Sequence, residues 1–453
     1  MLTAERSISE VTISFFNGKR LPAAAFKLDS ERLRTGWYSD KYFNNILRTL
    51  EGSRQDGEAL IPGYRPGEAV VEMQFFTRRR PRSLAVGVDK ALAILKEATG
   101  CQQDGTFVSR WEALEVEAVH DGSWLHYDGE PMEVPPALKV RGRYADFAVL
   151  ETPILGILSR GTRIATNVYE VLKAARGKPV LFFPARFDAH EIQAADGYAY
   201  QIAVERYRHD FGRGPDALVS TDAQGDWWGG AGGGTVAHAL IAAYLGDTAA
   251  AMLAYARFVP PEVPRIALVD FNNDCVGDSL AVAETLWDEF AHHYAAGSRS
   301  EAERYRLHGV RPDTAGSLRD ESVTPLGDPK LDFGVNPRLV FNLRRALDEA
   351  PLRWRVPSGL EEVAQSYARG VKIVATGGFS AERIAQFEGL KVPVDAYGVG
   401  SSLFSNSNKE GTNNDFTADV VRAKINGGWR NVAKVGRQPN DNPQLEPVDL
   451  SLL

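Results

Sequence analysis

Two short glycine-containing segments have the residue types that bind phosphate groups. Residues 374–379 read VATGGF just before an expected helix, and residues 397–402 read YGVGSS. Glycine lets backbone N–H groups approach phosphate oxygens closely, and a helix N-terminus favours a dianion. A plain tight turn explains either segment alone, but two neighbouring strands that both end in glycine favour a joint phosphate site. The predicted phosphate-binding residues are Gly377, Gly378, Gly398, Gly400 and Ser401.

Charged residues at other expected strand ends have the chemistry to bind the rest of a phosphorylated sugar. Residues 309–316 read GVRPDTAG, and side chains two apart in an extended segment share a face, so Arg311 and Asp313 lie together. Arginine binds phosphate through paired hydrogen bonds, and aspartate binds ribose hydroxyls or Mg²⁺. The alternative is an internal ion pair. Asp270, which ends the segment RIALVD, has the same ambiguity.

A glycine-rich segment at residues 229–238, GGAGGGTVAH, leads into a helix with His238 in its first turn. No lysine follows the glycines, which excludes a P-loop. An imidazole near a helix N-terminus is placed to act beside an anion, and a purely structural histidine is the alternative. The segment FPAR offers the aromatic face of Phe183 and the guanidinium of Arg186 to a planar acidic substrate.

From about residue 151, short β-branched or aromatic runs alternate with amphipathic helical segments. We expect strands at residues 179–183, 217–220, 265–270, 309–313, 371–376 and 394–399. We expect helices at residues 163–175, 197–207, 235–255, 337–349 and 381–388. This alternation predicts an α/β fold with parallel strands, either a barrel or a doubly wound sheet. Ligands bind at the carboxyl ends of such strands, where the residues above are found.

The first third and the tail have a different pattern. We expect helices at residues 39–51 and 83–98, a strand at 69–76, and strands and turns in the proline-containing segment 122–140. Strand-like runs at residues 416–425 and 431–435 follow a polar loop. We therefore predict an α+β domain of residues 1–150 plus about 405–453, and a barrel of residues 151–404 that carries the active site.

Composition excludes several classes of protein and partner. The chain has 453 residues, of which 44% are hydrophobic and 25% charged, with a net charge of −7. This is typical of a folded protein and provides no long-range attraction to nucleic acid or anionic lipid. The only cysteines are Cys101 and Cys275, which favours a reducing compartment. Residues 1–16 lack the apolar core of a signal peptide, and no run is long enough to span a membrane, so we predict a cytoplasmic location.

Taken in chain order, these motifs resemble the nicotinate phosphoribosyltransferase family and, more distantly, the nicotinamide phosphoribosyltransferases. The matching motifs are SDKYF (39–43), ETPILG (151–156), FPAR (183–186), STD (220–222), GTVAH (234–238), LVD (268–270), GVRPD (309–313), ATGGF (375–379) and DAYGVGSS (395–402). The resemblance implies an irregular α/β barrel of the type II phosphoribosyltransferases beside an α+β domain built from both chain ends. It also implies a homodimer with active sites at the subunit interface.

The resemblance further implies a reaction and a set of roles. The reaction is ATP-linked, Mg²⁺-dependent transfer from 5-phosphoribosyl diphosphate to nicotinate, which gives nicotinate mononucleotide and pyrophosphate in NAD salvage. His238 matches the histidine that ATP phosphorylates, Arg311 and Asp313 match contacts to ribose and diphosphate, and the glycines with Ser401 match the 5′-phosphate cradle. The predicted substrate-binding residues are Tyr42, supplied to the base by the partner subunit, with Phe183, Arg186, Thr221, Asp222 and Asp270. Metal ligands are not assigned.

Several positions leave alternatives open. Phe187 follows Arg186 where nicotinate enzymes commonly have paired arginines, and Asp222 stands where nicotinamide enzymes have an aspartate near the amide. Asn273 stands where the family has a second aspartate after LVD. The base is therefore nicotinate, or else nicotinamide or another pyridine. A non-catalytic nucleotide-binding homologue and an unrelated sugar-phosphate barrel enzyme are further alternatives. Quinolinate phosphoribosyltransferases are shorter and lack the GTVAH-type histidine.

Overall fold

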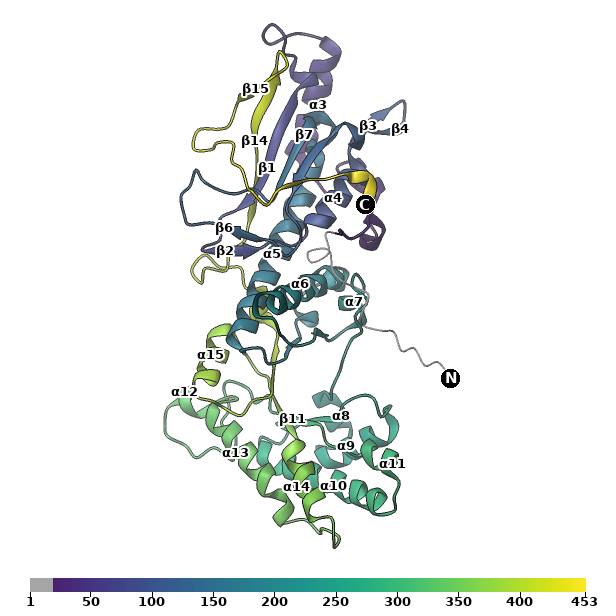
Figure 1. The fold of residues 1–453 in the computed structure, drawn as a ribbon, viewed down its shortest axis with the longest axis vertical. Helices are drawn as coiled ribbons and strands as arrows, with labels where there is room; N and C mark the ends of the chain where they lie inside the picture. Colours follow the sequence, from purple (N-terminus) through teal and green to yellow (C-terminus); the bar gives the residue numbers. More distant parts are fainter. Residues whose placement is uncertain (1–18) are drawn as a thin grey trace.

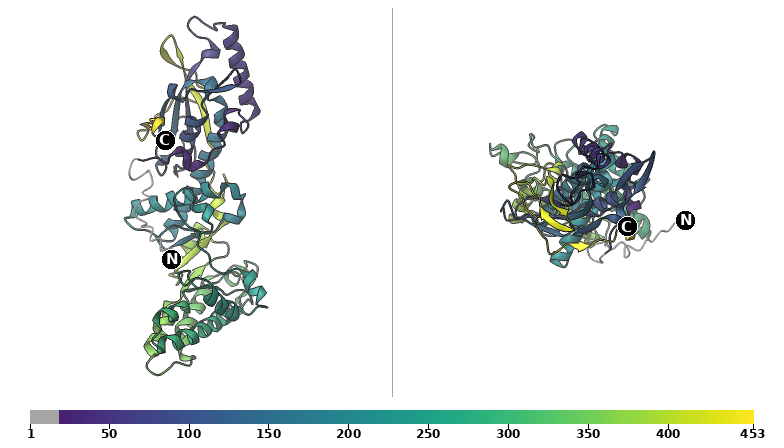
Figure 2. Two further views of the ribbon diagram at one scale, coloured as in Figure 1. Left: turned by 90° about the vertical axis from the view of Figure 1, so that its right-hand side faces the viewer. Right: turned by 90° about the horizontal axis from the view of Figure 1, so that it is seen from above.

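The computed structural model describes residues 19–453. The expected absence of a signal peptide concerns residues 1–16, which lie outside this part. The described chain is elongated, with a sheet of strands from both chain ends at one end and a helical region at the other (Figures 1 and 2). A search of residues 19–453 finds no helix long and apolar enough to cross a membrane.

Six short parallel strands form one sheet in the order β10-β11-β12-β13-β8-β9. Their bounds are β8 Val180–Phe182, β9 Leu218–Val219, β10 Ile266–Leu268, β11 Gly309–Arg311, β12 Lys372–Ala375 and β13 Ala396–Val399. This spatial order follows the chain order in a circle, except that β9 and β10 are not paired. The sheet is therefore a barrel that is open at one place, which confirms the predicted irregular α/β barrel.

Buried residues dominate the barrel strands, because helices cover the outer face of the sheet. The helices of this part are α5 Glu151–Ala174, α6 Gln193–Phe211, α7 Asp222–Gly225, α8 His238–Ala243, α9 Thr248–Phe258, α10 Cys275–Ala295, α11 Arg299–Arg304, α12 Pro329–Asp332, α13 Pro337–Glu349, α14 Glu361–Gly370 and α15 Ala381–Gly389. The expected strands are confirmed with shorter bounds, and helix 337–349 is confirmed at both ends.

The helix expected over residues 235–255 is wrong in one respect, because the chain forms two helices there. The segment between α8 and α9 turns with Leu245 and Gly246 at positive φ, 56° and 90°. Asp247 then begins α9, since its side chain accepts a hydrogen bond from the Ala250 N–H at 2.8 Å. The apolar pattern continues across this break, so periodicity alone predicts one continuous helix.

A second six-stranded sheet combines strands from the two ends of the chain, in the order β15-β14-β1-β7-β5-β16. Its strands are β1 Val70–Thr77, β5 Glu115–Ala118, β7 Leu138–Arg143, β14 Phe416–Ile425, β15 Gly428–Asn431 and β16 Glu446–Pro447. Strand β14 pairs antiparallel with β1, with Val71 opposite Ala423. The predicted return of the tail is confirmed, although the last hairpin strand precedes the expected residues 431–435 because the turn lies at Asn426 and Gly427.

Smaller elements complete this α+β part. They are α2 Ser30–Arg34, α3 Lys41–Asp56, α4 Val88–Ala98, β2 Arg82–Leu84, β3 Gly100–Gln103, β4 Thr106–Ser109 and β6 Trp124–His126. The expected helix 83–98 is wrong at its start, because Ser83 and Leu84 belong to β2 and Gly87 has φ 102° just before α4.

The two parts have separate hydrophobic cores that are joined by α5. Ile154 and Leu158 in the first half of α5 pack in the core of the α+β part. Ile164 and Val168 in the second half pack in the core of the barrel. The expected domain boundaries after residue 150 and near residue 405 stay predictions.

Candidate active site

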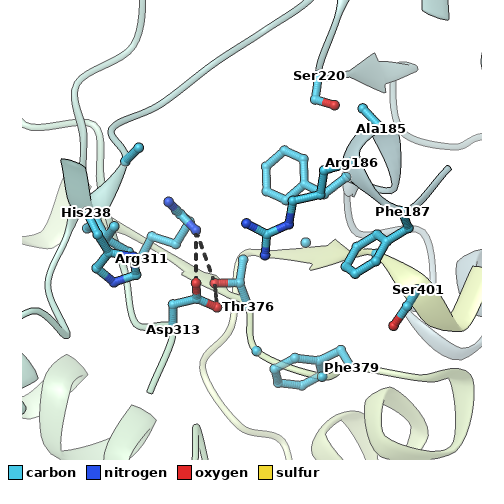
Figure 3. A pocket seen from close by; sticks show the side chains of 17 residues that line it. Ala185, Arg186, Phe187, Ser220, His238, Arg311, Asp313, Thr376, Phe379 and Ser401 are labelled. Atoms are coloured by element: carbon cyan, nitrogen blue, oxygen red, sulfur yellow. Dashed lines mark hydrogen bonds and ion pairs between the residues drawn. The ribbon is translucent and has the colours of Figure 1, made fainter. Parts of the chain in front are cut away.

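A cavity of about 370 Å³ lies at the carboxyl ends of the barrel strands (Figure 3). Its lining includes ten of the residues predicted from the sequence, namely Phe183, Arg186, His238, Arg311, Asp313, Gly377, Gly378, Gly398, Gly400 and Ser401. The remaining lining residues are Ala185, Phe187, Ser220, Ala237, Leu268, Thr376 and Phe379. Because parallel strands end at the same edge of the sheet, residues far apart in the chain meet there.

One wall of the cavity is a network around Arg311, at the end of β11. Its Nη1 lies 3.6 Å from Asp313 Oδ2 and donates to Thr376 Oγ1 at 3.4 Å, and its Nη2 donates to the Val236 carbonyl at 2.8 Å. The Thr376 hydroxyl donates to Asp313 Oδ1 at 2.7 Å. Burial lowers the pKa of Arg311. Arg311 Nε is buried without a hydrogen-bond partner among the described residues, so this rigidly held cation keeps a free donor.

The opposite wall follows β8. The Phe183 N–H donates to the Val399 carbonyl at 2.9 Å, and a short helical turn, Ala185–Phe187, then presents Arg186. The Arg186 guanidinium points into the cavity and lies 5.5 Å from the ring centre of Phe187 (Figure 3). Within residues 19–453, no carboxylate forms an ion pair with Arg186. Arg186 and Arg311 are close enough for Arg186 to lower the pKa of Arg311, so the cavity is suited to an anionic ligand.

The two glycine turns lie side by side at the ends of β12 and β13, which are paired in parallel. The Ser402 hydroxyl in the second turn donates to the Phe379 carbonyl in the first at 2.8 Å. The backbone N–H groups of Gly377, Gly378 and Phe379 donate no hydrogen bond within the described chain. The same holds for those of Gly400, Ser401 and Ser402 among residues 19–453. Both turns thus place free N–H donors at the cavity, as a phosphate dianion requires.

His238 is the first residue of α8, and its imidazole lines the cavity beside Arg311 (Figure 3). Its Nε2 lies 3.0 Å from Asp270 Oδ1. Burial raises the pKa of Asp270, and the neighbouring His238 lowers it. Asp270 is not among the residues that line the cavity, but its hydrogen bond orients the imidazole that does. When Asp270 accepts a hydrogen bond from Nε2–H, Nδ1 retains its lone pair and is available as a nucleophile.

Four predicted substrate-binding residues do not line the cavity: Asp270, Thr221, Asp222 and Tyr42. Thr221 begins α7, where its hydroxyl accepts from the Gln224 N–H and donates to Gln193 Oε1 at 2.8 Å. Asp222 Oδ1 accepts from the Gly232 N–H at 2.8 Å and so holds the glycine-rich loop. Of the STD motif, only Ser220 lines the cavity. The ligand-binding roles of Thr221 and Asp222 stay predictions.

Tyr42 lies in α3, in the α+β part and far from the barrel end that carries α8 (Figure 1). Its side chain is 59% exposed, beside the exposed Trp37 and Tyr38. A single chain therefore does not bring Tyr42 to the cavity, and its expected contact with the base of a partner subunit stays a prediction.

Sequence reasoning missed residues that adjoin its motifs. Thr376 joins Arg311 to Asp313, and Phe379 lines the cavity, but the motif ATGGF by itself predicts neither role. Phe187 stands where a second arginine is expected, and it lines the cavity. Arg383 lies behind the turn, and its place three residues into the expected helix was the available signal, since helical side chains lean toward the N-terminus.

The donor set fits a Mg²⁺ ion that arrives with a diphosphate. No group of three or more histidine, cysteine, aspartate or glutamate side chains in residues 19–453 is arranged to hold a metal. Asp313 and Asp270 are nevertheless neighbours, since the charge of Asp313 raises the pKa of Asp270. Mg²⁺ is usually bound by one or two carboxylates together with substrate phosphates, and Asp313, which lines the cavity while Asp270 is bonded to His238, matches that pattern.

Comparison with known proteins identifies the fold. No family model matches the sequence, and no curated protein matches it either. A nicotinate-nucleotide pyrophosphorylase from Pyrococcus furiosus is similar in structure, with 25% sequence identity and a TM-score of 0.61 over 91% of this chain and 80% of that one. Human nicotinic acid phosphoribosyltransferase is similar in fold, with 17% identity and a TM-score of 0.53 over 86% of this chain and 75% of that one. These matches confirm the resemblance that the motifs predict.

Proposed function

We propose that this chain, which has the fold of the type II phosphoribosyltransferases, transfers a phosphoribosyl group from 5-phosphoribosyl diphosphate to nicotinate in NAD synthesis. The observation that carries this proposal is the composition of one cavity. Two guanidinium groups, those of Arg186 and Arg311, face a space bordered by two joined turns with free N–H donors. A substrate with a phosphate at one end and a diphosphate and an anionic base at the other matches this distribution of charge.

Each end of the substrate has a counterpart in the cavity. The N–H groups of the glycine turns and the Ser401 hydroxyl bind the 5′-phosphate, and Asp313 accepts from the ribose hydroxyls. Arg311 binds the diphosphate, with Asp313 as the cavity residue that would hold Mg²⁺. When bound, Mg²⁺ neutralises the charge on the leaving pyrophosphate. Phe183 stacks on the pyridine ring while Arg186 pairs with its carboxylate.

The reaction requires positioning and charge stabilisation, without a general base. The pyridine nitrogen has a free lone pair, which forms the bond to C1′ as the bond from C1′ to the diphosphate oxygen breaks. The electron pair of that bond leaves with pyrophosphate. Arg311 stabilises this developing negative charge, and stacking on Phe183 holds the nitrogen near C1′.

His238 links the reaction to ATP. Its Nδ1 attacks the γ-phosphorus, ADP departs, and Asp270 stabilises the positive imidazole through Nε2–H. Water then hydrolyses the phosphohistidine to phosphate and histidine. The negative phosphoryl group would alter the charge balance beside Arg311 in each cycle, which couples ATP to substrate binding or to release of pyrophosphate.

Steady-state formation of mononucleotide, with nicotinate and nicotinamide compared in the presence and absence of ATP, tests the proposal. We expect nicotinate mononucleotide and a faster rate with ATP. A preference for nicotinamide would mean that nicotinamide is the substrate. The single guanidinium beside Phe187 favours this alternative. Absence of product with either base would favour a non-catalytic nucleotide-binding homologue.

His238→Ala separates ATP coupling from the transfer itself. We expect this variant to lose ATP hydrolysis coupled to turnover while it keeps a slow ATP-independent synthesis. His190→Ala is the matched control, since the His190 side chain is 85% exposed and its one ion pair within residues 19–453 is with the adjacent Glu191. Unchanged coupling in His238→Ala would remove His238 from the mechanism.

The proposed homodimer with shared active sites is tested by mixing two inactive variants. Tyr42→Ala removes the aromatic side chain that the resemblance assigns to the active site of the partner subunit. Arg186→Ala removes the cation from the active site of the subunit's own barrel. If sites are shared, reassociated mixtures contain some sites with both residues intact and recover activity. Mixtures that stay as inactive as either variant would contradict the contribution of Tyr42 across subunits.

A further inference from the structure

Arg383, in the first turn of α15, lies behind the glycine turn that follows β12. Its Nη1 donates to the carbonyl oxygens of Gly377 and Gly378, at 2.8 and 3.1 Å, and its Nη2 donates to the Val335 carbonyl at 2.8 Å. One guanidinium therefore holds the two consecutive carbonyls of the turn and ties them to a distant segment of the barrel.

These bonds fix the direction of the N–H groups. In a trans peptide the carbonyl oxygen and the following N–H point in opposite directions. When Arg383 holds the carbonyls of Gly377 and Gly378, the N–H groups of Gly378 and Phe379 must point away from it. Neither N–H donates a hydrogen bond within the described chain, and both residues line the cavity.

The charge of Arg383 has no anionic counterpart in the described chain. Its guanidinium packs against the ring of Phe379, at 4.6 Å from the centre, and near that of Phe387 at 6.0 Å. No carboxylate within residues 19–453 forms an ion pair with it. Hydrogen bonds to carbonyls satisfy its donors but leave a full positive charge beside the turn, where a bound dianion would balance it.

Arg344 provides a natural comparison at the other end of the same strand. Its Nη1 donates to the Val371 carbonyl at 2.7 Å and its Nη2 to the Ala368 carbonyl at 3.1 Å. Unlike Arg383, it is paired with a carboxylate, Asp348, at 2.7 Å. The two arginines bind backbone in the same way, but only Arg383 combines this with an unbalanced charge beside the cavity.

We propose that Arg383 is a positioning residue for the 5′-phosphate: it holds the glycine turn by its carbonyls so that the N–H groups face the ligand, and its charge balances the dianion. This inference rests on the proposed function, in which the turn binds the 5′-phosphate of the sugar. Arg383 itself does not touch the reacting atoms. Loss of Arg383 should weaken binding of the sugar phosphate without altering recognition of the base.

Calorimetric titration with ribose 5-phosphate, together with the KM values for 5-phosphoribosyl diphosphate and nicotinate, tests the proposal in full-length protein. Arg383→Gln should weaken ribose 5-phosphate binding by about tenfold or more, the effect of losing about 1.4 kcal/mol. The KM for 5-phosphoribosyl diphosphate should rise, and the KM for nicotinate should not. Arg383→Lys, which keeps the charge but cannot bridge three carbonyls, should give an intermediate affinity that falls as salt is added.

Arg344→Gln is the control for a purely structural loss of carbonyl contacts. It should lower Tm about as much as Arg383→Gln does, while its affinity for ribose 5-phosphate stays within about twofold of the wild type. Equal affinity in a folded Arg383→Gln protein would overturn the inference, as would an equal loss in Arg344→Gln.

The outcomes also separate this inference from the proposed function. Wild-type protein that makes mononucleotide, with Arg383→Gln unchanged in KM, contradicts the inference alone. Wild-type protein that binds ribose 5-phosphate through Arg383 but makes no mononucleotide contradicts the proposed function alone. Folded wild-type protein that binds no ribose 5-phosphate contradicts both.

Discussion

The turns after β12 and β13 border the same cavity, but they contain glycine for different physical reasons. In the first, Gly377 and Gly378 have φ angles of 94° and 70°, and added Cβ atoms would meet nothing closer than 3.4 and 3.6 Å. At the second, a Cβ on Gly398, which lies near the end of β13, would be 2.5 Å from Thr376 Cγ2, and one on Gly400 would be 2.7 Å from Phe187 Cε2. The first turn needs glycine for its backbone conformation, whereas the second needs it for space.

This difference predicts that substitutions in the two glycine motifs have different effects. A side chain in the first turn would redirect the N–H groups that face the cavity and leave the walls in place. A side chain in the second would push the walls apart, because Phe183 and Phe187 pack directly against it. Substitutions in the first turn should therefore lower ligand affinity, and substitutions in the second should also lower the stability of the fold.

Gly398→Val should have the largest effect. The added side chain overlaps Thr376 Cγ2 and the Phe183 ring, and overpacking of this kind costs about 1–3 kcal/mol of the free energy of unfolding. Displacement of Thr376 and Phe183 should also weaken binding of both the base and the sugar phosphate. Chemical denaturation and calorimetric titration measure the two effects. Gly370→Val is the control, because a Cβ there meets nothing within 4 Å; equal stability of the two variants would contradict the spatial role of Gly398.

Gly377→Ala should act on binding more than on stability. An L-residue at positive φ costs about 1–2 kcal/mol, so the turn relaxes and its N–H groups rotate away from the phosphate. We expect affinity for ribose 5-phosphate to fall about tenfold while nicotinate affinity is kept. Gly359→Ala controls for strain alone, since Gly359 has φ 84° in open space outside the cavity lining. A similar loss of affinity in that control would refute the argument.

Gly400→Ala should cost less, because its close neighbour is able to move. The Phe187 side chain is 47% exposed, so its ring can swing outward when a methyl group appears at position 400. We expect a loss of about 1 kcal/mol in ribose 5-phosphate binding that is relieved when Phe187→Ala is added. A double-mutant cycle measures this coupling, and strictly additive effects would mean that the two residues do not compete for space.

Ser402→Ala should have the smallest effect and should act on both turns. It removes the hydrogen bond to the Phe379 carbonyl that joins them, a partly buried contact whose loss costs about 0.5 kcal/mol. Affinity for ribose 5-phosphate should fall about twofold. Ser402→Thr, which retains the hydroxyl, is the control. A much larger loss in Ser402→Ala would indicate that the turns depend on each other more than their separate geometries suggest.

The barrel and most of the cavity lining were predictable because both follow from local chemistry. Most residues of short strands such as β12 and β13 are buried, and in β12 the sequence shows this as the apolar run at residues 373–375. Once parallel strands are assigned, their carboxyl ends must converge, and this places Arg186, Arg311 and the glycines together.

The remaining features depend on contacts that no local pattern encodes. The break between α8 and α9 relies on positive φ at Leu245, a residue that rarely adopts it. The hydrogen bond from the Thr221 hydroxyl to Gln193 joins two elements that lie 28 residues apart in the chain. The position of Arg383 in the first turn of the expected helix lets its side chain reach back toward the glycine turn, but the carbonyls that it binds are fixed only by the fold.

The unpaired edge between β9 and β10 has a consequence for the histidine. The glycine-rich segment that leads to His238 touches the sheet there through one bridge, Val219 to Gly232, where Gly233 N–H donates to the Val219 carbonyl at 2.8 Å. A segment inside a closed ladder would have to break bonds on both sides before it shifted. Among the described residues, the segment that leads to His238 pairs with a strand on one side only, and Asp222 and Arg311 also hold it through side-chain hydrogen bonds. The histidine that we propose as the phosphorylated group therefore follows a segment that can shift without breaking a second strand pairing.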